Sequence, residues 1–242
     1  MPSYSIVIPA YNEQALLPKT LAAVRQAMTE VQMAGEVIVV DNNSTDATAE
    51  IARDHGVQVV FEPVNQISRA RNAGAQAAKG HLLVFLDADT LLSGALLRAA
   101  LDNLASGRCC GGGAVVDFDK PMPWLVRGFR SFWNRRAVRS GLAAGCFVYC
   151  LREAFDEIGG FSEKVYASEE IWLSRALRLW GKKRGLAFCV ITEATAVTSA
   201  RKLEWFSMWH MAAVLLTMLL FPLALRIRWL CWAWYRRPKN SG

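Results

Sequence analysis

Short runs of β-branched and apolar residues alternate with segments of helical period over residues 1–105. The runs that read as strands cover 5–9, 36–41, 57–61 and 81–87, and the helical segments cover 14–33, 46–54, 67–79 and 93–105. Strands that are apolar throughout and alternate with helices are typical of a parallel sheet with both faces covered. The pattern therefore predicts an α/β fold with a mostly parallel central sheet and helices on both faces.

The remaining chain continues this pattern as far as a boundary near residue 200. Further strands are expected over 114–118 and 145–151 and a helix over 168–180. Of the net charge of +7, the last 42 residues carry +6, and residues 1–200 are nearly neutral. We therefore predict a globular domain over 1–200 and a hydrophobic, basic tail over 201–242. A nucleic-acid binder should instead spread basic charge over a folded face, so no nucleic-acid partner is expected.

Composition excludes several classes of protein. A hydrophobic content of 53% rules out a disordered, collagen-like or coiled-coil chain. The six cysteines form no Cys-x-x-Cys pair and have no neighbouring His, which argues against zinc and indicates a reducing compartment. No basic segment of a signal peptide precedes the first strand. The globular body is therefore expected in the cytoplasm.

Polar residues gather where the predicted strands end, and the sharpest group is Asp87-Ala88-Asp89. Ligands of open α/β sheets bind beyond the carboxyl ends of the strands. If the chain stays extended there, Asp87 and Asp89 share a face. Such hard oxygen ligands suit Mg²⁺ or Mn²⁺ bridging to a diphosphate. The alternative is that Asp89 caps the helix beginning near Leu91.

Four segments together carry a family resemblance. They read SIVIPAYNE over 5–13, VDNNSTDAT over 40–48, ARNAG over 70–74 and LVFLDADT over 83–90, each at a strand-to-helix junction. Their joint occurrence in this order resembles the family 2 glycosyltransferases, which have the GT-A fold, over about residues 4–200.

This resemblance implies a role for each matching residue. Pro9, Ala10, Tyr11 and Glu13 would line a nucleotide pocket, Asp41 would contact the base or ribose, Arg71 would approach the nucleotide, and Asp87 and Asp89 would hold metal and diphosphate. Physical chemistry leaves alternatives open. Asp41 can accept two donors from a nucleotide or close an Asx turn. The guanidinium fork of Arg71 suits a phosphate or a neighbouring carboxylate equally.

A second group of matching residues lies further along the chain. The segment ASEEIWLSR over 167–175 resembles the family's Glu-Asp segment, with Glu170 where the family usually has Asp. The resemblance makes Glu170, beside Glu169, the base that deprotonates the acceptor. The alternative is that both acids only stabilise the helix dipole. Gly159 and Gly160 match a loop between the sugar and acceptor sides, or form a plain turn with positive φ.

The kind of transfer follows from two further observations. A single positioned base fits inversion by direct displacement, because no nucleophile for a retaining double displacement can be located. Processive members of the family carry a Gln-x-x-Arg-Trp motif after the Glu-Asp segment. The last Gln of this chain is Gln76, so single-sugar transfer is expected.

Two segments indicate a membrane surface. Residues 120–152 contain no acid, and Leu125, Phe129, Phe132 and Trp133 keep helical spacing among arginines. A basic amphipathic helix has this pattern, although a surface helix packed on the sheet is the alternative. A second segment, 205–225, has no charged residue and is long enough to span a bilayer.

The residues around this second segment argue against a span. Pro222 interrupts it and five basic residues follow it, against the positive-inside rule. We therefore expect a helical tail lying in the interface or re-entrant, at the cytoplasmic face of the membrane. The aromatic residues at headgroup depth would be Trp229, Trp232, Trp234 and Tyr235.

Together these observations predict a Mn²⁺- or Mg²⁺-dependent, inverting glycosyltransferase. It would move one sugar from a nucleotide-diphosphate sugar to a lipid-linked or amphiphilic acceptor. Its membrane surface would be 205–235, with 122–139 as a second candidate. A soluble acceptor with a tail that only anchors the enzyme is an alternative. Another is a non-catalytic sugar-nucleotide-binding or scaffold protein, for which Glu170 is the one supporting feature.

Overall fold

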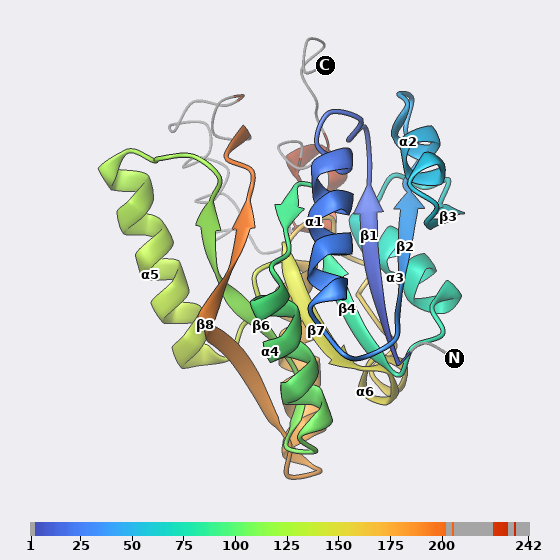
Figure 1. Ribbon diagram of the computed structural model, residues 1–242. Coiled ribbons are helices and arrows are strands. Elements are labelled where there is room, and N and C mark those ends of the chain that lie inside the picture. The colour runs from blue at the N-terminus through green and yellow to red at the C-terminus, as the bar shows by residue number, and fades with distance from the viewer. Residues whose placement is uncertain (1–2, 202–204, 206–224, 232–234, 236–242) are drawn as a thin grey trace.

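The computed structural model describes residues 3–201, 205, 225–231 and 235. Its strands form a single sheet in the order β3-β2-β1-β4-β7-β6-β8-β5 (Figure 1). The strands are β1 Tyr4–Ala10, β2 Gly35–Asp41, β3 Gln58–Phe61, β4 Leu82–Leu86, β5 Thr90–Leu91, β6 Cys109–Phe118, β7 Phe147–Leu151 and β8 Ala187–Thr198. The helices are α1 Leu17–Thr29, α2 Thr48–Asp54, α3 Ile67–Ala77, α4 Gly94–Ala105, α5 Trp124–Ser140, α6 Arg152–Glu157, α7 Glu169–Lys182 and the short 3-10 helix η2 Arg228–Cys231.

The sheet is mixed rather than mostly parallel. Strands β1 to β4 pair in parallel, as their apolar runs predict. Beyond β4 the sheet departs from this expectation in part: β7 runs antiparallel to both β4 and β6, and β5 runs antiparallel to β8, whereas β6 and β8 pair in parallel. Strand β8 was not predicted from the sequence. Its residues are mostly half-exposed and its register against β6 shifts between Ala114 and Val115, so neither a buried run nor a regular alternation marks it.

Helices cover both faces of the sheet, which confirms that part of the prediction. Alternate residues of β1 point to opposite sides, as strand geometry requires. Tyr4, Ile6 and Ile8 join the apolar core beneath α1 and α4, whereas Val7 joins the core beneath α3, α6 and α7. Two separate cores therefore hold the sheet rigid between them.

Glycine lets α3 approach the sheet closely. A Cβ atom on Gly74 would lie 2.3 Å from Val7 Cγ1 and 2.8 Å from Val40 Cγ2. No L side chain fits there without moving a strand residue. This close packing places Arg71, one turn earlier on α3, directly under the carboxyl ends of the central strands.

The predicted membrane-facing segment lies almost entirely outside the described residues, since 206–224 are not among them. Within the described ranges, no helix is both long and apolar enough to cross a membrane. The described part of the tail returns to the globular body, where the Tyr166 N–H donates to Leu225 O at 2.7 Å and Cys231 is buried.

Candidate active site

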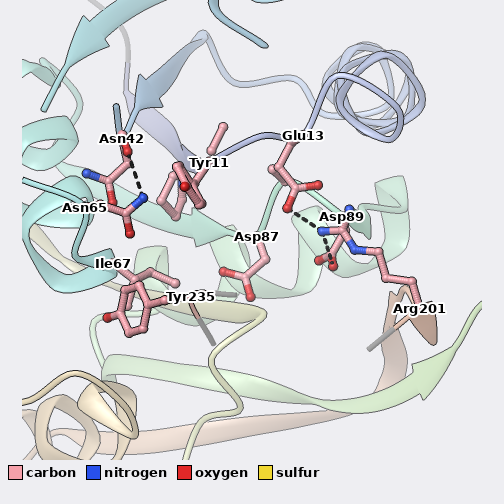
Figure 2. A pocket seen from close by; sticks show the side chains of 12 residues that line it. Tyr11, Glu13, Asn42, Asn65, Ile67, Asp87, Asp89, Arg201 and Tyr235 are labelled. Carbon is pink, nitrogen blue, oxygen red and sulfur yellow. Dashed lines mark hydrogen bonds and ion pairs between the residues drawn. The ribbon is translucent and has the colours of Figure 1, made fainter. Parts of the chain in front are cut away.

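A pocket of about 590 Å³, open solvent at its mouth included, lies at the carboxyl ends of β1, β2 and β4 (Figure 2). The pocket is lined by Pro9, Ala10, Tyr11, Glu13, Asn42, Asn65, Ile67, Asp87, Ala88, Asp89, Arg201 and Tyr235. The structure therefore brings together Pro9, Ala10, Tyr11, Glu13, Asp87 and Asp89 from the sequence-predicted set.

The loops that follow β1 and β2 are tied to each other by hydrogen bonds. Asn12, at φ 51°, accepts from the Thr45 N–H at 2.8 Å, and the Glu13 N–H donates to Thr48 Oγ1 at 2.8 Å. Asp46 accepts from the Thr48 N–H at 3.0 Å. The polar residues of the second loop thus hold the first loop, and with it the pocket wall, in place.

Asp41 lies behind the pocket instead of lining it. It is buried, and its Oδ1 accepts from the Ser44 N–H at 3.0 Å, so in this structure the carboxylate bonds the backbone of its own loop. Its neighbour Asn42 reaches the pocket wall, and the Asn42 Nδ2 donates to Val64 O at 2.6 Å. Asn42 and Asn65 went unpredicted because asparagines in a loop carry no distinctive pattern.

The chain turns immediately after β4, so Asp87 and Asp89 do not share the face of an extended strand. The turn closes where the Thr90 N–H donates to Asp87 O at 3.0 Å. Each carboxylate meets a different arginine, at 2.8 Å from Asp87 to Arg71 and at 3.0 Å from Asp89 to Arg201. The helix-cap alternative for Asp89 is wrong, because Ser93 caps α4.

Arg71 is 1% exposed and held on several sides. It donates to Glu169 at 2.5 Å, to Asp87 at 2.8 Å and to Gly145 O at 2.7 Å. The Phe161 ring centre lies 5.1 Å from its guanidinium carbon. In this structure Arg71 therefore forms salt bridges to neighbouring carboxylates, which is the alternative that the sequence left open. Arg71 therefore joins the Asp87 turn to the start of α7.

Two acids that adjoin in the sequence have different surroundings at the start of α7. Glu169 is buried and paired with Arg71. Glu170 is half-buried, and a Cβ on Gly145 would lie 3.5 Å from its carboxyl carbon. The pKa of Glu170 is raised to about 8, mainly by burial and next by the negative charge of Glu169. The positive charge of Arg71 acts in the opposite direction. A carboxylate with a pKa close to neutrality is suited to accept a proton.

Gly159 and Gly160 end α6 and do not line the pocket. Both have positive φ, and the Gly160 N–H donates to Phe155 O at 3.0 Å. The turn they form leads into Phe161, whose N–H donates to Asn72 Oδ1 at 2.9 Å. In this structure the two glycines therefore place the ring that covers Arg71.

The sequence reading missed the pocket role of Arg201 and Tyr235, both in the predicted tail. Arg201 follows β8, and its Nη2 donates to Glu13 and Asp89 (Figure 2). The Tyr235 hydroxyl donates to Tyr166 O at 2.8 Å, and its side chain forms part of the pocket wall. Without β8 in the predicted sheet, no sequence signal directs Arg201 to the site.

The charges of the site favour a bound cation. Within the described part of the chain, the carboxylates of Glu13, Asp87, Asp89 and Glu169 pair with Arg71 and Arg201, and the Glu170 carboxyl lies beside Glu169. Among the described residues, no cluster of three or more His, Cys, Asp or Glu could hold a metal by itself. Mg²⁺ and Mn²⁺ bound with a nucleotide commonly take one or two carboxylates and complete their shell with phosphate and water. Asp87 and Asp89 fit that donor set.

A doubly covered sheet with a pocket at the carboxyl ends of its parallel strands is the arrangement in which α/β folds bind nucleotides. The family model for Glycosyl transferase family 2 matches residues 5–159. The chain belongs to this family.

Comparison with known proteins gives relatives of the same kind. An uncharacterized glycosyltransferase of Mycobacterium tuberculosis is 34% identical over 128 residues, which are 51% of this chain and 54% of that protein. The chain thus spans about half the length of this curated relative. An undecaprenyl-phosphate 4-deoxy-4-formamido-L-arabinose transferase of Aeromonas hydrophila is 39% identical over 92 residues, 35% of this chain and 28% of that protein.

A solved structure shows the same fold. The mannosyltransferase PcManGT of Pyrobaculum calidifontis, in complex with GDP-Man and Mn²⁺, superposes with a TM-score of 0.68 at 22% identity. The match covers 88% of this chain and 60% of that one.

Proposed function

We propose that this protein is a metal-dependent glycosyltransferase that moves one sugar, with inversion, from a nucleotide-diphosphate sugar to a lipid-linked or amphiphilic acceptor. The observation that carries the proposal is the pocket that Tyr11, Glu13, Asp87 and Asp89 line together at the carboxyl ends of the parallel strands. The solved relative with GDP-Man and Mn²⁺ supports a donor of this chemical class.

The charge of the pocket supports metal dependence. A diphosphate is strongly anionic, and the carboxylates of Glu13, Asp87 and Asp89 in the pocket wall would repel it unless a cation lay between them. A divalent ion on Asp87 and Asp89 would neutralise the diphosphate as it leaves. The carboxylate pair would orient the ion, and Arg71 and Glu169 behind Asp87 would fix the turn from which Asp87 projects.

Arg201 supplies a further positive charge in the pocket wall. Its Nη2 is held by Glu13 and Asp89. Within the described part of the chain, its Nε is buried without a hydrogen-bond partner. A guanidinium with an unused donor beside the metal-binding turn is suited to a diphosphate oxygen. Arg201 would thus hold Asp89 in the free protein and share its donors with the diphosphate in the complex.

Glu170 would act as the base. As the acceptor hydroxyl oxygen attacks the anomeric carbon of the sugar, its proton passes to the Glu170 carboxylate, and the bond from that carbon to the diphosphate oxygen breaks. The electron pair of that bond leaves with the nucleoside diphosphate. A single displacement of this kind inverts the configuration at the anomeric carbon. The raised pKa of Glu170, about 8, matches it to this proton transfer near neutral pH.

The class of acceptor is supported by a relative and by surface chemistry. The Aeromonas hydrophila relative is named for transfer to undecaprenyl phosphate, a lipid. The outward face of α5 exposes Trp124, Phe129 and Phe132 among arginines. An enzyme with such a surface is suited to an acceptor that sits at a membrane.

A thermal-shift panel of UDP-, GDP- and dTDP-sugars, each with and without Mn²⁺, tests the proposal. A donor at 100 times its dissociation constant should stabilise the protein by ~2.7 kcal/mol. We expect stabilisation by one nucleotide class, dependent on Mn²⁺ and lost in Asp87→Asn. Stabilisation by no member of the panel would contradict the proposal. Binding without consumption of the donor would favour the non-catalytic alternative.

A further inference from the structure

Helix α5 stands at the edge of the fold, beside β6 and β8 (Figure 1). It is fastened to the sheet mainly by polar contacts. Asn134 bonds both the N–H and the C=O of Val116, at 3.1 and 2.9 Å, and Arg130 pairs with Asp117. Ala137 is the one fully buried residue among those of α5. An amphipathic helix normally buries its large apolar residues, so this attachment is unusual.

Most of the large apolar residues of α5 are exposed, whereas Val126 and Trp133 are half-buried. Trp124 is 72% exposed, Phe129 55% and Phe132 59%, and Leu125 is exposed as well. Leu125, Phe129 and Phe132 are spaced four and three residues apart, which places them on one stripe of the helix. Trp133, the fourth residue of the predicted apolar face, is half-buried, so α5 packs on β6 and β8 with one side and exposes the stripe of Leu125, Phe129 and Phe132 on the other. The helix presents an apolar stripe to its surroundings.

Basic residues surround this stripe. Arg127, Arg135, Arg136 and Arg139 are exposed, and no acid occurs between Lys120 and Arg152. Aromatic and aliphatic side chains mixed with arginine are typical of helices that lie in the plane of a membrane interface. A second copy of the same face would bring arginines against arginines, which disfavours self-association. Anionic lipid headgroups complement the arginines, and the acyl boundary accommodates the apolar side chains.

We propose that the outward face of α5, formed by Trp124, Leu125, Phe129 and Phe132 with Arg135, Arg136 and Arg139, docks on the surface of an anionic bilayer. The inference goes beyond the proposed activity, because it rests on the exposure and charge of α5 alone.

Docking by α5 would also orient the site. The segment leading into α5 is tied to the end of β8, since the Asp119 N–H donates to Thr198 O at 3.0 Å and the Ala200 N–H donates to Asp119 Oδ1 at 2.9 Å. Arg201 of the pocket wall follows directly. The start of α5 and the pocket therefore share one corner of the fold, and a bilayer on α5 would bring lipid-linked acceptors to that corner.

A fluorescent label on α5 itself separates this helix from any other membrane-binding segment. Gly128 lies on the exposed side of α5, and a Cβ there would meet nothing within 4 Å. We would attach the environment-sensitive dye NBD to Gly128→Cys in the full chain with Cys189→Ser, which removes the one described cysteine that is not buried. The matched control carries the dye on Glu50→Cys, at an exposed position of α2, which lies beside the opposite edge of the sheet (Figure 1).

The label is read with vesicles of phosphatidylcholine alone and with vesicles containing about one third phosphatidylglycerol. We expect a blue shift and at least a twofold rise in emission at position 128 with anionic vesicles only, and no change at position 50. An unchanged spectrum at position 128 while the chain binds vesicles would overturn the proposal. A blue-shifted spectrum without vesicles would overturn it too, because protein would then already cover α5.

Variants of the full chain test the same surface without a label. The triple change Leu125→Ser, Phe129→Ser, Phe132→Ser should lower partitioning into anionic vesicles at least tenfold, as should Arg135→Gln, Arg136→Gln, Arg139→Gln. The control Leu179→Ser alters a side chain that is 65% exposed on α7 and should partition like the wild type. Unchanged partitioning of both triple variants would contradict docking by α5, whichever other segment holds the chain to the vesicle.

Discussion

Replacing Glu170 by Gln should abolish the proton acceptor and leave the donor pocket intact. Gln has nearly the same size and a similar helix propensity, and Glu170 does not line the pocket. Arg71 keeps its partners Glu169 and Asp87. Loss of a general base lowers a rate ~10²–10⁴-fold. We expect transfer at least about a hundredfold slower, with donor affinity unchanged.

The same substitution has a pH-dependent effect on stability. The pKa of Glu170 is raised from 4.5 to about 8, chiefly by burial. At about 1.4 kcal/mol per pKa unit, ionising it costs the native state up to roughly 5 kcal/mol. Glu170 ionises near pH 4.5 in the unfolded chain and near pH 8 in the native protein. The free energy of unfolding of the wild type therefore falls as the pH rises from 4.5 to 8, and the loss is complete above pH 8. The Gln variant has no ionisable group at this position, so this fall in its free energy of unfolding is absent.

Two measurements check this prediction. Urea unfolding below pH 4.5 should give similar free energies for both proteins, whereas above pH 8 the Gln variant should be the more stable. The transfer rate of the wild type should rise with pH about a midpoint near 8, and the residual rate of the variant should not. Glu169→Gln serves as the contrast, because it removes one of the two carboxylate partners of the buried Arg71 and should lower stability at neutral pH.

A Gln variant that transfers sugar at the wild-type rate with the wild-type pH profile would show that Glu170 is not the proton acceptor. A slow variant without the gain in stability at high pH would show that burial does not raise the pKa of Glu170. The proton acceptor would then have to be sought elsewhere.

Asp87→Asn and Asp89→Asn should each keep the fold and lose the Mn²⁺-dependent stabilisation by donor, as measured by thermal shift; a shift like that of the wild type in both would exclude them as metal ligands. Arg71→Met should destabilise the protein by about 3–5 kcal/mol in urea unfolding, because it leaves the buried Glu169 unpaired; a loss below about 1 kcal/mol would show that the pair is not buried. Gly74→Ala should cost about 1–3 kcal/mol through overpacking, and an unchanged urea midpoint would show that α3 has room to move.

The half of the fold that carries the nucleotide pocket was predictable because its strands are short, apolar and separated by clear helices. Parallel strands buried on both faces leave that pattern, and their ends locate residues such as Tyr11 and Asp87. The other half was not predictable to the same extent. Strand β8 is mostly half-exposed and irregular in register, and antiparallel pairing of β7 is not encoded by the apolar run from which β7 itself was predicted.

The site shows a similar division. The sequence located Asp87, Asp89 and Glu170, but not the arginine that each aspartate meets, since those pairings arise from long-range packing. From the sequence alone, Arg201 belongs to the predicted basic tail. In the structure it follows β8, which places it in the pocket wall. The helical spacing over α5 was read correctly, whereas the direction in which its apolar stripe faces depends on how Asn134 and Arg130 hold the helix to β6.

The central claim is that this pocket consumes a nucleotide-diphosphate sugar. The most direct test is the release of nucleoside diphosphate from UDP-, GDP- and dTDP-sugars by the full chain, with Mn²⁺ and a lipid extract as the source of acceptor. The account predicts release from one donor class, none in Asp87→Asn, and a rate at least about a hundredfold lower in Glu170→Gln. Donor binding without release from any member of the panel would contradict it and identify a sugar-nucleotide-binding protein without transferase activity.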